Sequence, residues 1–262
     1  MSGRVGYSRG GMNFPNVKEK VFKDALFNPG DYVKYAKEKR GMNKGDIPEK
    51  IILCYHPGLL SYVQKLENVN QHQRFITIEV DGVKIGVVGH NGIGAPAAVV
   101  HLEELIAQGG KEFLLFGFAG TLQKNIDIAD LIVCDRAIRD EGCSYHYKTP
   151  EKYANGSSLM AFKSEESLKK LGHKFHRGSS WTTDAPYRET VDEIKEYQEE
   201  GVLSVEMEAS ALFTVAEYRG VDLSCIFMVS DSLADLKWNP QFHNKKIKAE
   251  ELFKIVTGPF LL

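Results

Sequence analysis

Two glutamates separated by one methionine are the first candidates for chemistry in this sequence. Glu206, Met207 and Glu208 stand where an apolar helix is predicted to begin. A carboxylate can accept hydrogen bonds from two neighbouring hydroxyl groups, and a methionine side chain packs well on the apolar face of a sugar. Acidic residues in a first helical turn are also favoured by the helix dipole alone. The run is therefore typical either of a sugar-binding site or of an ordinary helix start.

Asp231 is a further candidate, because it follows Ser230 at the end of the apolar run Cys225–Val229. An aspartate in this position can simply cap the helix that follows a strand. If its carboxyl group lies in a cleft, it can instead act as a general acid and donate a proton to a leaving group. The residues alone leave both interpretations open.

Glycines and a polar, aromatic segment provide the remaining candidates. Gly92 and Gly94 stand just before Pro96, so the N–H groups of a helix start could bind an anion or a sugar hydroxyl there. A tight turn that needs glycine explains the same pattern. The third glycine of the dinucleotide-binding fingerprint is missing, which argues against an oxidoreductase. The run Trp181–Arg188 could form a planar wall for a base, with Arg188 as a donor to its edge, or be an ordinary packed loop.

Strands and helices that alternate along the chain must position these residues. Short apolar runs indicate buried strands, and apolar residues at helical spacing indicate helices. The predicted strands are Ile51–Tyr55, Phe113–Phe116, Leu131–Cys134 and Cys225–Val229, the predicted helices are Ala97–Gln108, Glu165–Leu171 and Val205–Arg219, and a hairpin spans residues 74–88 with its turn at Asp81-Gly82. This alternation is typical of the α/β class, with α/β/α layering around a mostly parallel sheet.

Ligands bind at the carboxyl ends of the strands in such sheets, and three predicted loops fall there. They are Gly92–Ala95, Gly117–Gly120 and Ser230–Asp231, so Gly92, Gly120 and Asp231 are expected to converge. Residues 1–48 are predicted to form an irregular arm with one short helix near Tyr32–Glu38, and residues 49–262 a single catalytic domain.

Composition excludes several classes of protein. The 262 residues carry a formal net charge of −2, so there is no broad cationic field to attract a nucleic acid. No stretch approaches the ~20 apolar residues that cross a bilayer, and the first residues lack the apolar run of a secretory signal. The four cysteines are far apart, and no Cys or His set has metal-ligand spacing. We therefore expect a cytoplasmic protein without a disulfide or a metal, and with no nucleic-acid or membrane partner.

Longer runs in the sequence are similar to a known family. Three runs carry the similarity: NGIGAPAAVVHLEELIAQGGKEFLLFGFAGTLQKNIDIADLIVCDRAIRDEGCSYHY, VEMEASALFTVAEYRG and MVSD. They resemble the nucleoside phosphorylase family of the uridine phosphorylase and purine nucleoside phosphorylase type, which includes related nucleosidases. Together these runs extend the resemblance over roughly residues 50–235. It implies a three-layer α/β/α sandwich around a mixed, mostly parallel, distorted sheet. It also implies a small-molecule nucleoside as substrate, no cofactor, phosphate as the co-substrate of phosphorylases, and a homodimer or homohexamer with shared active sites.

The resemblance also implies roles for single residues. Glu208 would bind the ribose 2′- and 3′-hydroxyls, Met207 would line the sugar pocket and Glu206 would support the same face. Asp231 matches the acid with which purine-cleaving members protonate the base. Gly92 and Gly120 lie in the turns that would contact the substrate, and Trp181 and Arg188 belong to the segment that would face the base.

This sequence departs from the family pattern at the residues that bind phosphate in phosphorolytic members. Phosphorolytic members carry Gly-Asp-Pro-x-Arg after the first strand and Arg-x-Gly-Thr at the phosphate strand, whereas this sequence has Tyr55-His56-Pro57-Gly58-Leu59 and Leu115-Phe116-Gly117-Phe118. Arg74 lies one position away from the arginine that a neighbouring subunit would contribute, and it is a candidate anion contact; Arg136, Arg139 and Arg188 are other replacements. Phosphorylase-type pentosyl transfer and hydrolysis by a nucleosidase therefore both remain open, and a catalytically inactive nucleoside-binding protein is the alternative of a different class.

Overall fold

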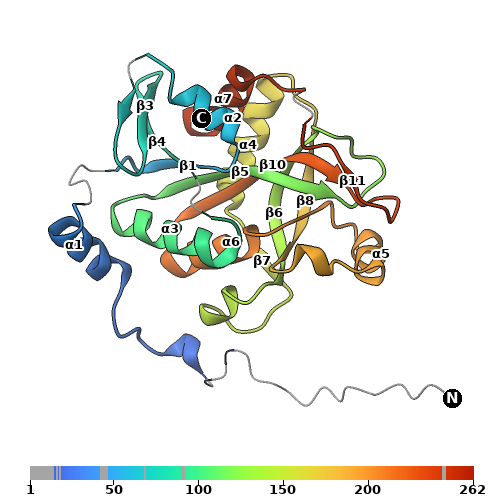
Figure 1. The fold of residues 1–262 in the computed structure, drawn as a ribbon, viewed down its shortest axis with the longest axis horizontal. Helices are drawn as coiled ribbons and strands as arrows, with labels where there is room; N and C mark the ends of the chain where they lie inside the picture. Colours follow the sequence, from blue (N-terminus) through green and yellow to red (C-terminus); the bar gives the residue numbers. More distant parts are fainter. Residues whose placement is uncertain are drawn as a thin grey trace.

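One mixed sheet with helices on both faces forms the body of the molecule, in agreement with the predicted three-layer α/β/α sandwich (Figure 1). The structure is a computed structural model, which describes residues 15, 17, 19–41, 47–67, 69–89, 92–243 and 246–262. Gly92 is among the described residues, whereas residues 90 and 91, which precede it, are not.

Eleven strands make up the sheet in the described part of the chain. They are β1 (Lys50–Cys54), β2 (Asn70–Gln71), β3 (Ile76–Val80), β4 (Val83–Gly89), β5 (Glu112–Thr121), β6 (Leu131–Asp140), β7 (Tyr153–Asn155), β8 (Phe175–Thr183), β9 (Ser204–Glu206), β10 (Asp222–Ser232) and β11 (Asn239–Pro240). The order is β11-β10-β6-β8-β9-β5-β1-β4-β3-β2, with β7 paired to β6 outside this path, and β10 also pairs with β5. Strands β5, β10, β6, β8 and β9 therefore close into a ring, from which β1, β4, β3 and β2 continue as an open sheet.

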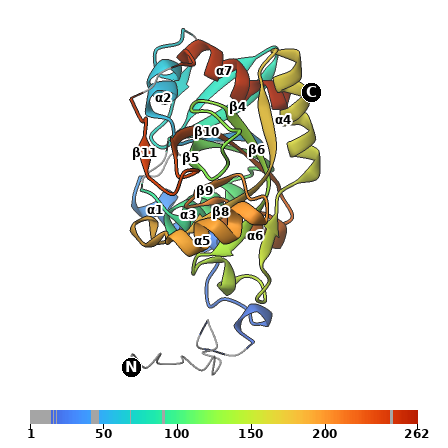
Figure 2. The same cartoon turned by 90° about the vertical axis from the view of Figure 1, so that its right-hand side faces the viewer.

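Helices cover the two faces of this sheet unequally (Figure 2). The helices are α1 (Pro29–Lys39), α2 (Pro57–Val63), α3 (Ala95–Ala107), α4 (Ser158–Lys170), α5 (Val191–Glu199), α6 (Ala209–Arg219) and α7 (Ala249–Thr257), and short 3-10 turns span Lys20–Phe22, Ser144–His146, Pro186–Arg188 and Gly258–Leu261. Helices α3 and α6 pack on one face, and α2, α4 and α7 pack on the other. Helix α5 lies beside the closed ring, and α1 packs against α3.

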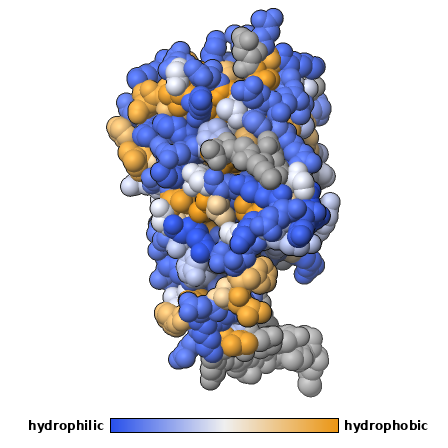
Figure 3. Space-filling model, turned by 90° about the vertical axis from the view of Figure 1, so that its left-hand side faces the viewer, coloured by the Kyte–Doolittle hydropathy of each residue, from blue (hydrophilic) through white to orange (hydrophobic). Residues whose placement is uncertain are grey.

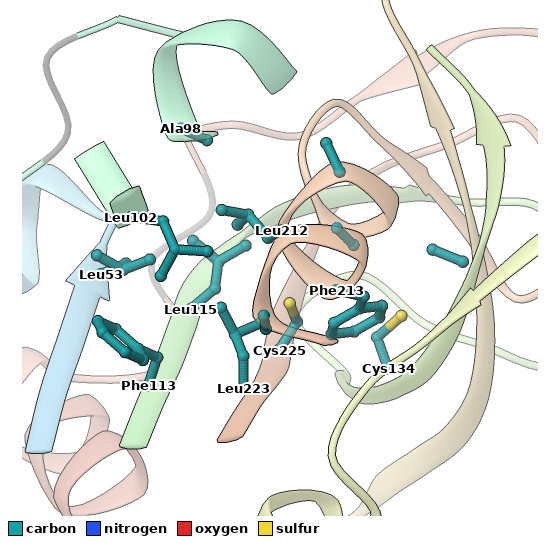
Figure 4. Packing of buried hydrophobic residues seen from close by; sticks show 14 of the residues in the cluster. Leu53, Ala98, Leu102, Phe113, Leu115, Cys134, Leu212, Phe213, Leu223 and Cys225 are labelled. Carbon is teal, nitrogen blue, oxygen red and sulfur yellow. The ribbon is translucent and has the colours of Figure 1, made fainter. Parts of the chain in front are cut away.

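Apolar side chains from the central strands fill the space between the layers. Figure 4 shows Leu115 of β5 among Leu53, Leu102 and Leu212, which come from β1, α3 and α6. The adjacent residue Phe116 belongs to the core on the other face, because successive side chains of a strand point to opposite sides. Burying each of these side chains contributes about 1.5–3 kcal/mol, so the two cores hold the sheet between its helices.

The apolar runs located the central strands correctly, and the hairpin is confirmed. Its turn residues Asp81 and Gly82 have φ values of 50° and 78°, the left-handed conformation that suits a two-residue hairpin turn. The predicted loops Gly117–Gly120 and Ser230–Asp231 instead belong to β5 and β10, close to the carboxyl end of each strand. Gly120 pairs with Asp231 on one side and Val205 on the other, so backbone pairing keeps these polar and glycine residues in the sheet.

The predicted start of the helix at Val205 was also wrong. Val205 and Glu206 belong to β9, and α6 begins only at Ala209. Val205 pairs with Gly120 and with Trp181, two residues that are distant in sequence. A helical hydrophobic pattern cannot reveal such pairings, because they depend on strands elsewhere in the chain.

The surface is mostly hydrophilic on the face that Figure 3 shows, with hydrophobic side chains in separate patches. Some of these patches lie on the narrow lower part of the molecule, where the segment before α1 extends away from the body in Figure 1. Phe22, Leu26 and Phe27 of this segment are exposed, and Lys20 Nζ lies 2.6 Å from His146 Nδ1. In the part of the chain that the structure describes, no helix has the length and apolar character needed to span a membrane.

Candidate active site

Three strand ends meet at one place in the closed ring. β5 contributes Gly120, β9 contributes Glu206, and β10 contributes Asp231, which the register places beside Gly120. They line a cavity of about 580 Å³. Phe118, Met207 and Trp238 line it too, together with residues between Pro186 and Ile194. The predicted convergence of Gly120 and Asp231 is therefore found at the carboxyl ends of parallel strands.

Glu206 holds the beginning of α6. Its carboxylate is 5 % exposed, and its Oε2 accepts hydrogen bonds from the backbone N–H groups of Glu208 and Ala209, both at 2.7 Å. Thr182 Oγ1 donates to Oε1 at 2.5 Å. Burial raises the pKa of Glu206, and the negative charge of Glu208 raises it further. These contacts tie Glu206 to the start of α6 and to β8, and its predicted support of a sugar-binding face stays a prediction.

Glu208 joins the beginnings of two helices. It precedes α6 as its N-cap residue, and its Oε1 accepts a hydrogen bond from the N–H of Gly94 at 2.7 Å, where α3 begins. Gly94 has a φ of 92°, a conformation that glycine adopts without strain. Burial raises the pKa of Glu208. One N–H group of the glycine turn is thus bound to a carboxylate of the protein itself, and Met207 beside it lines the cavity.

Asp231 is oriented by donors on both of its oxygens. Ser230 Oγ donates to Oδ1 at 2.7 Å, and Trp238 Nε1 donates to Oδ2 at 3.0 Å. The register of β10 shifts between Val229 and Asp231, which is the local irregularity of a β-bulge. A Cβ atom at Gly120 would lie 3.0 Å from Oδ2, so the glycine leaves room for the carboxylate. The side chain of Asp231 is thereby fixed at the cavity, 8 % exposed.

A third carboxyl group lines the same cavity, and the sequence did not single it out. Glu189 follows the 3-10 turn Pro186–Arg188 and precedes α5. Burial raises its pKa to about 7, and the negative charges of Asp231 and Glu193 contribute to the shift. Its place next to Arg188, in the segment predicted to face a base, was the one signal in the sequence that pointed to it.

Other predicted site residues lie outside the lining of this cavity. Trp181 is 1 % exposed, packs against the Tyr197 ring at a centroid distance of 4.9 Å, and donates from Nε1 to Asp140 Oδ2 at 2.9 Å. Arg188 is exposed. Gly92 lies in the turn before α3 with a φ of 118°. The segment reaches the cavity through Pro186, Tyr187 and Glu189 instead, so a base-facing role for Trp181 and Arg188 gains no support from their positions.

The positions where the family pattern has phosphate-binding residues are apolar. Leu115 is fully buried in the core that Figure 4 shows, and Leu59 is fully buried in the core on the other face of the sheet. Phe118 lines the cavity, and the His56 ring lies 4.9 Å from its ring, measured between centroids. Among the described residues that line the cavity, Lys237 is the one cation, and it is exposed.

Three of the four arginines considered as replacements have partners within the protein. Arg74 Nη1 lies 2.6 Å from Glu104 Oε2 in an ion pair. Arg139 donates to Ser144 Oγ and to the carbonyl oxygens of Thr149 and Lys148. The guanidinium of Arg136 stacks 4.5 Å from the centroid of the Tyr153 ring. An anion contact by Arg74 stays a prediction, and it would compete with the Glu104 carboxylate. No group of three or more His, Cys, Asp or Glu side chains is arranged to hold a metal within the described ranges.

Comparison with known proteins agrees with this geometry. The family model described as the phosphorylase superfamily matches residues 54–258. The chain is 28 % identical over 233 residues to a uridine phosphorylase of Thermococcus kodakarensis, covering 82 % of this chain and 79 % of the relative. It is 31 % identical over 202 residues to a DeoD-type purine nucleoside phosphorylase of Alkaliphilus metalliredigens, covering 74 % and 86 %. The crystal structure of uridine phosphorylase from Vibrio fischeri ES114 superposes with a TM-score of 0.72 at 26 % identity, covering 84 % of this chain and 94 % of that one.

Proposed function

Because the chain belongs to the phosphorylase superfamily, we propose that it cleaves the N-glycosidic bond of a purine nucleoside by pentosyl transfer. The observation that carries the proposal is a cavity lined both by Asp231 and by the Glu206-Met207 pair, which come from β10 and from the end of β9 on either side of β5. Glu208 follows directly at the start of α6. Met207 and Glu206 line the cavity beside Asp231, whereas Glu208 lies directly behind them and outside the lining, so a sugar would have to reach Glu208 past Met207.

Glu208 and Met207 hold the sugar in this proposal. A buried carboxylate accepts hydrogen bonds from two vicinal hydroxyls, and the thioether of Met207 contacts the apolar face of the ring. Glu206 keeps Glu208 in place, because it binds the N–H groups of Glu208 and Ala209. The chemistry needs no cofactor, since it consists of a proton transfer and a displacement at C1′.

Asp231 acts at the base. As the C1′–N bond breaks, its electron pair moves to the base, and Asp231 donates a proton to a ring nitrogen so that the base leaves neutral. Positive charge then develops on the sugar as an oxocarbenium-like state, and an oxygen nucleophile forms the new bond at C1′. Ser230 and Trp238 fix the carboxylate for this transfer.

Phosphate is the nucleophile that the similarity to phosphorylases favours. Water is the second candidate, and the apolar positions favour it. A desolvated phosphate needs fixed cationic donors, and each charge-assisted hydrogen bond contributes about 1.5–3 kcal/mol. Leu59 and Leu115 supply none, and Phe118 lines the cavity where a phosphate-binding threonine is expected. A nucleosidase would use water and release free sugar, with the water losing a proton.

A second copy of the chain is the proposed partner, in a homodimer or homohexamer with shared active sites. Tyr187 is 100 % exposed although it lines the cavity, and Trp238 and Phe242 are exposed there too. Large aromatic side chains at the mouth of a cavity favour burial by a neighbouring subunit. A cytoplasmic location and the absence of nucleic-acid and membrane partners stay predictions.

Release of free base from a panel of nucleosides, with and without phosphate, tests the proposal. We expect purine release, and its dependence on phosphate distinguishes pentosyl transfer from hydrolysis. Asp231→Asn is expected to slow release much more than it weakens binding, whereas the exposed Asp235→Asn is the matched control. Equal activity of Asp231→Asn, or uridine as the preferred substrate, would contradict the role of Asp231. Binding of nucleosides without any turnover would identify an inactive binding protein.

A further inference from the structure

Glu189 is a cavity-lining carboxyl group that the proposed reaction leaves without a task. It lies on the segment between the 3-10 turn and α5, in the same cavity as Asp231 on β10. Among the described residues, no lysine, arginine or histidine forms an ion pair with it, and no donor forms a hydrogen bond with it. A partly buried carboxyl group without a partner in the protein is costly, so a ligand is the natural partner.

The charged groups around Glu189 limit what it can bind. Asp231, Glu193 and the cavity-lining Glu206 are all acidic, and among the described residues that line the cavity Lys237 is the one cation and is exposed. Glu193 is itself occupied, because it accepts hydrogen bonds from the N–H and the hydroxyl of Thr190 at the start of α5. A carboxylate is a hydrogen-bond acceptor only, so the group that completes it must be a donor.

Purines differ at the atom beside the nitrogen that Asp231 would protonate. On this edge adenine offers the N7 acceptor and the N6 amino donor, whereas guanine offers N7 and the O6 acceptor. We propose that Glu189 is a specificity-determining residue, which accepts a hydrogen bond from the 6-amino group of a purine while Asp231 engages N7. The inference rests on the proposed function, and it names 6-aminopurine nucleosides as the substrate class.

The protonation of Glu189 makes this selection depend on pH. Its pKa of about 7 divides two states of the cavity. The ionised carboxylate accepts from a 6-amino group and repels the O6 of a 6-oxopurine. The protonated carboxyl group can donate to O6 instead, so 6-oxopurines gain relative to 6-aminopurines as the pH falls. Because one carboxyl group meets a donor in one substrate and an acceptor in the other, the ratio of kcat/KM for 6-aminopurine and 6-oxopurine nucleosides is expected to differ about tenfold or more between the two states.

The test compares kcat/KM for adenosine and inosine in three proteins at about pH 6 and about pH 8, on either side of the Glu189 pKa. In the native chain the adenosine-to-inosine ratio is expected to rise about tenfold with pH. Glu189→Gln is expected to lose this dependence, because an amide does not titrate and both donates and accepts. Glu196→Gln, an exposed residue of α5, is the matched control and is expected to behave like the native chain. A pH-dependent ratio that persists in Glu189→Gln would overturn the inference.

Calorimetric binding of adenine and hypoxanthine to the native chain and Glu189→Gln separates this inference from the proposed function. If no nucleoside releases base but adenine binds in a Glu189-dependent manner, the proposed reaction falls and base selection by Glu189 stands. If base is released with the same preference in both proteins, the inference about Glu189 falls alone. If neither base binds and neither nucleoside reacts, both are overturned.

Discussion

Gly120→Ala would place one methyl group against the proposed acid. The added Cβ would lie 3.0 Å from Asp231 Oδ2 and 2.8 Å from Leu233 Cδ1. Carbon atoms in contact are about 3.5–4.0 Å apart, so the end of Leu233 would have to move by about 1 Å. The carboxylate would have to give by a few tenths of an ångström, against the hydrogen bonds from Ser230 and Trp238.

Stability and activity should respond differently to this change. Overpacking costs about 1–3 kcal/mol in the free energy of unfolding. A catalytic group displaced by about 1 Å loses about a hundredfold in rate, so a smaller displacement of Asp231 should lower kcat about tenfold. The KM for the nucleoside should change little, because Glu208 lies on another element. Base release measured at saturating nucleoside, together with the melting temperature, gives both quantities.

Two comparisons make the prediction decisive. Gly117→Ala on the same strand is the matched control, because its Cβ would meet no atom closer than 3.6 Å. Adding Leu233→Val to Gly120→Ala removes the clash with Leu233 Cδ1 and should restore part of the stability while kcat stays low. If Gly120→Ala retained native kcat, or if the added Leu233→Val restored activity together with stability, the close approach to Asp231 would not explain the glycine.

Three further changes test neighbouring parts of the structure. Glu208→Gln should raise the KM for the nucleoside about tenfold with little change in melting temperature, because an amide still accepts from Gly94 but binds hydroxyls without charge; an unchanged KM would remove Glu208 from the sugar site. Ser224→Ala should raise the free energy of unfolding by up to about 1 kcal/mol in chemical denaturation, since among the described residues Ser224 Oγ is buried without a partner. Its control, Ser164→Ala, loses a hydrogen bond to the Met160 carbonyl oxygen and should lower the free energy of unfolding. Trp238→Phe removes the donor to Asp231 Oδ2 and should reduce kcat several-fold without lowering the melting temperature, because the indole is largely exposed; native kcat would show that the bond has no part in orienting the acid.

Local sequence patterns predicted the layers and the central strands, because apolar runs such as Phe113–Phe116 report burial directly. They could not predict that β5 continues to Thr121 or that Glu206 lies on a strand. Both facts depend on Gly120, which pairs with Val205 and Asp231 from the second half of the chain. Ring closure is a property of several distant segments at once, and no periodicity within one segment encodes it.

The candidate site was predictable to a similar extent. The types and positions of Glu208 and Asp231 pointed to a sugar and a leaving group, and the structure places Asp231 and Met207 in one cavity. Trp181 was selected for its aromatic ring, yet its indole packs in the core, because β8 directs it inward next to Tyr197. Glu189 was missed because a single glutamate among charged residues carries no signal until the fold brings it beside Asp231.

The ring of β5, β10, β6, β8 and β9 has a consequence for how copies of this chain can associate. Strands inside a closed ring have partners on both sides, and in the described part of the chain the outer strands are short: β2 and β11 have two residues each and β7, beside β6, has three. Long unpaired edges are the sites where sheets extend into aggregates. Within the described residues the sheet therefore offers only short edges along which a second copy could extend it. Specific assembly is left to side chains on helices and loops, so the choice of neighbour can change through surface substitutions while the sheet stays the same.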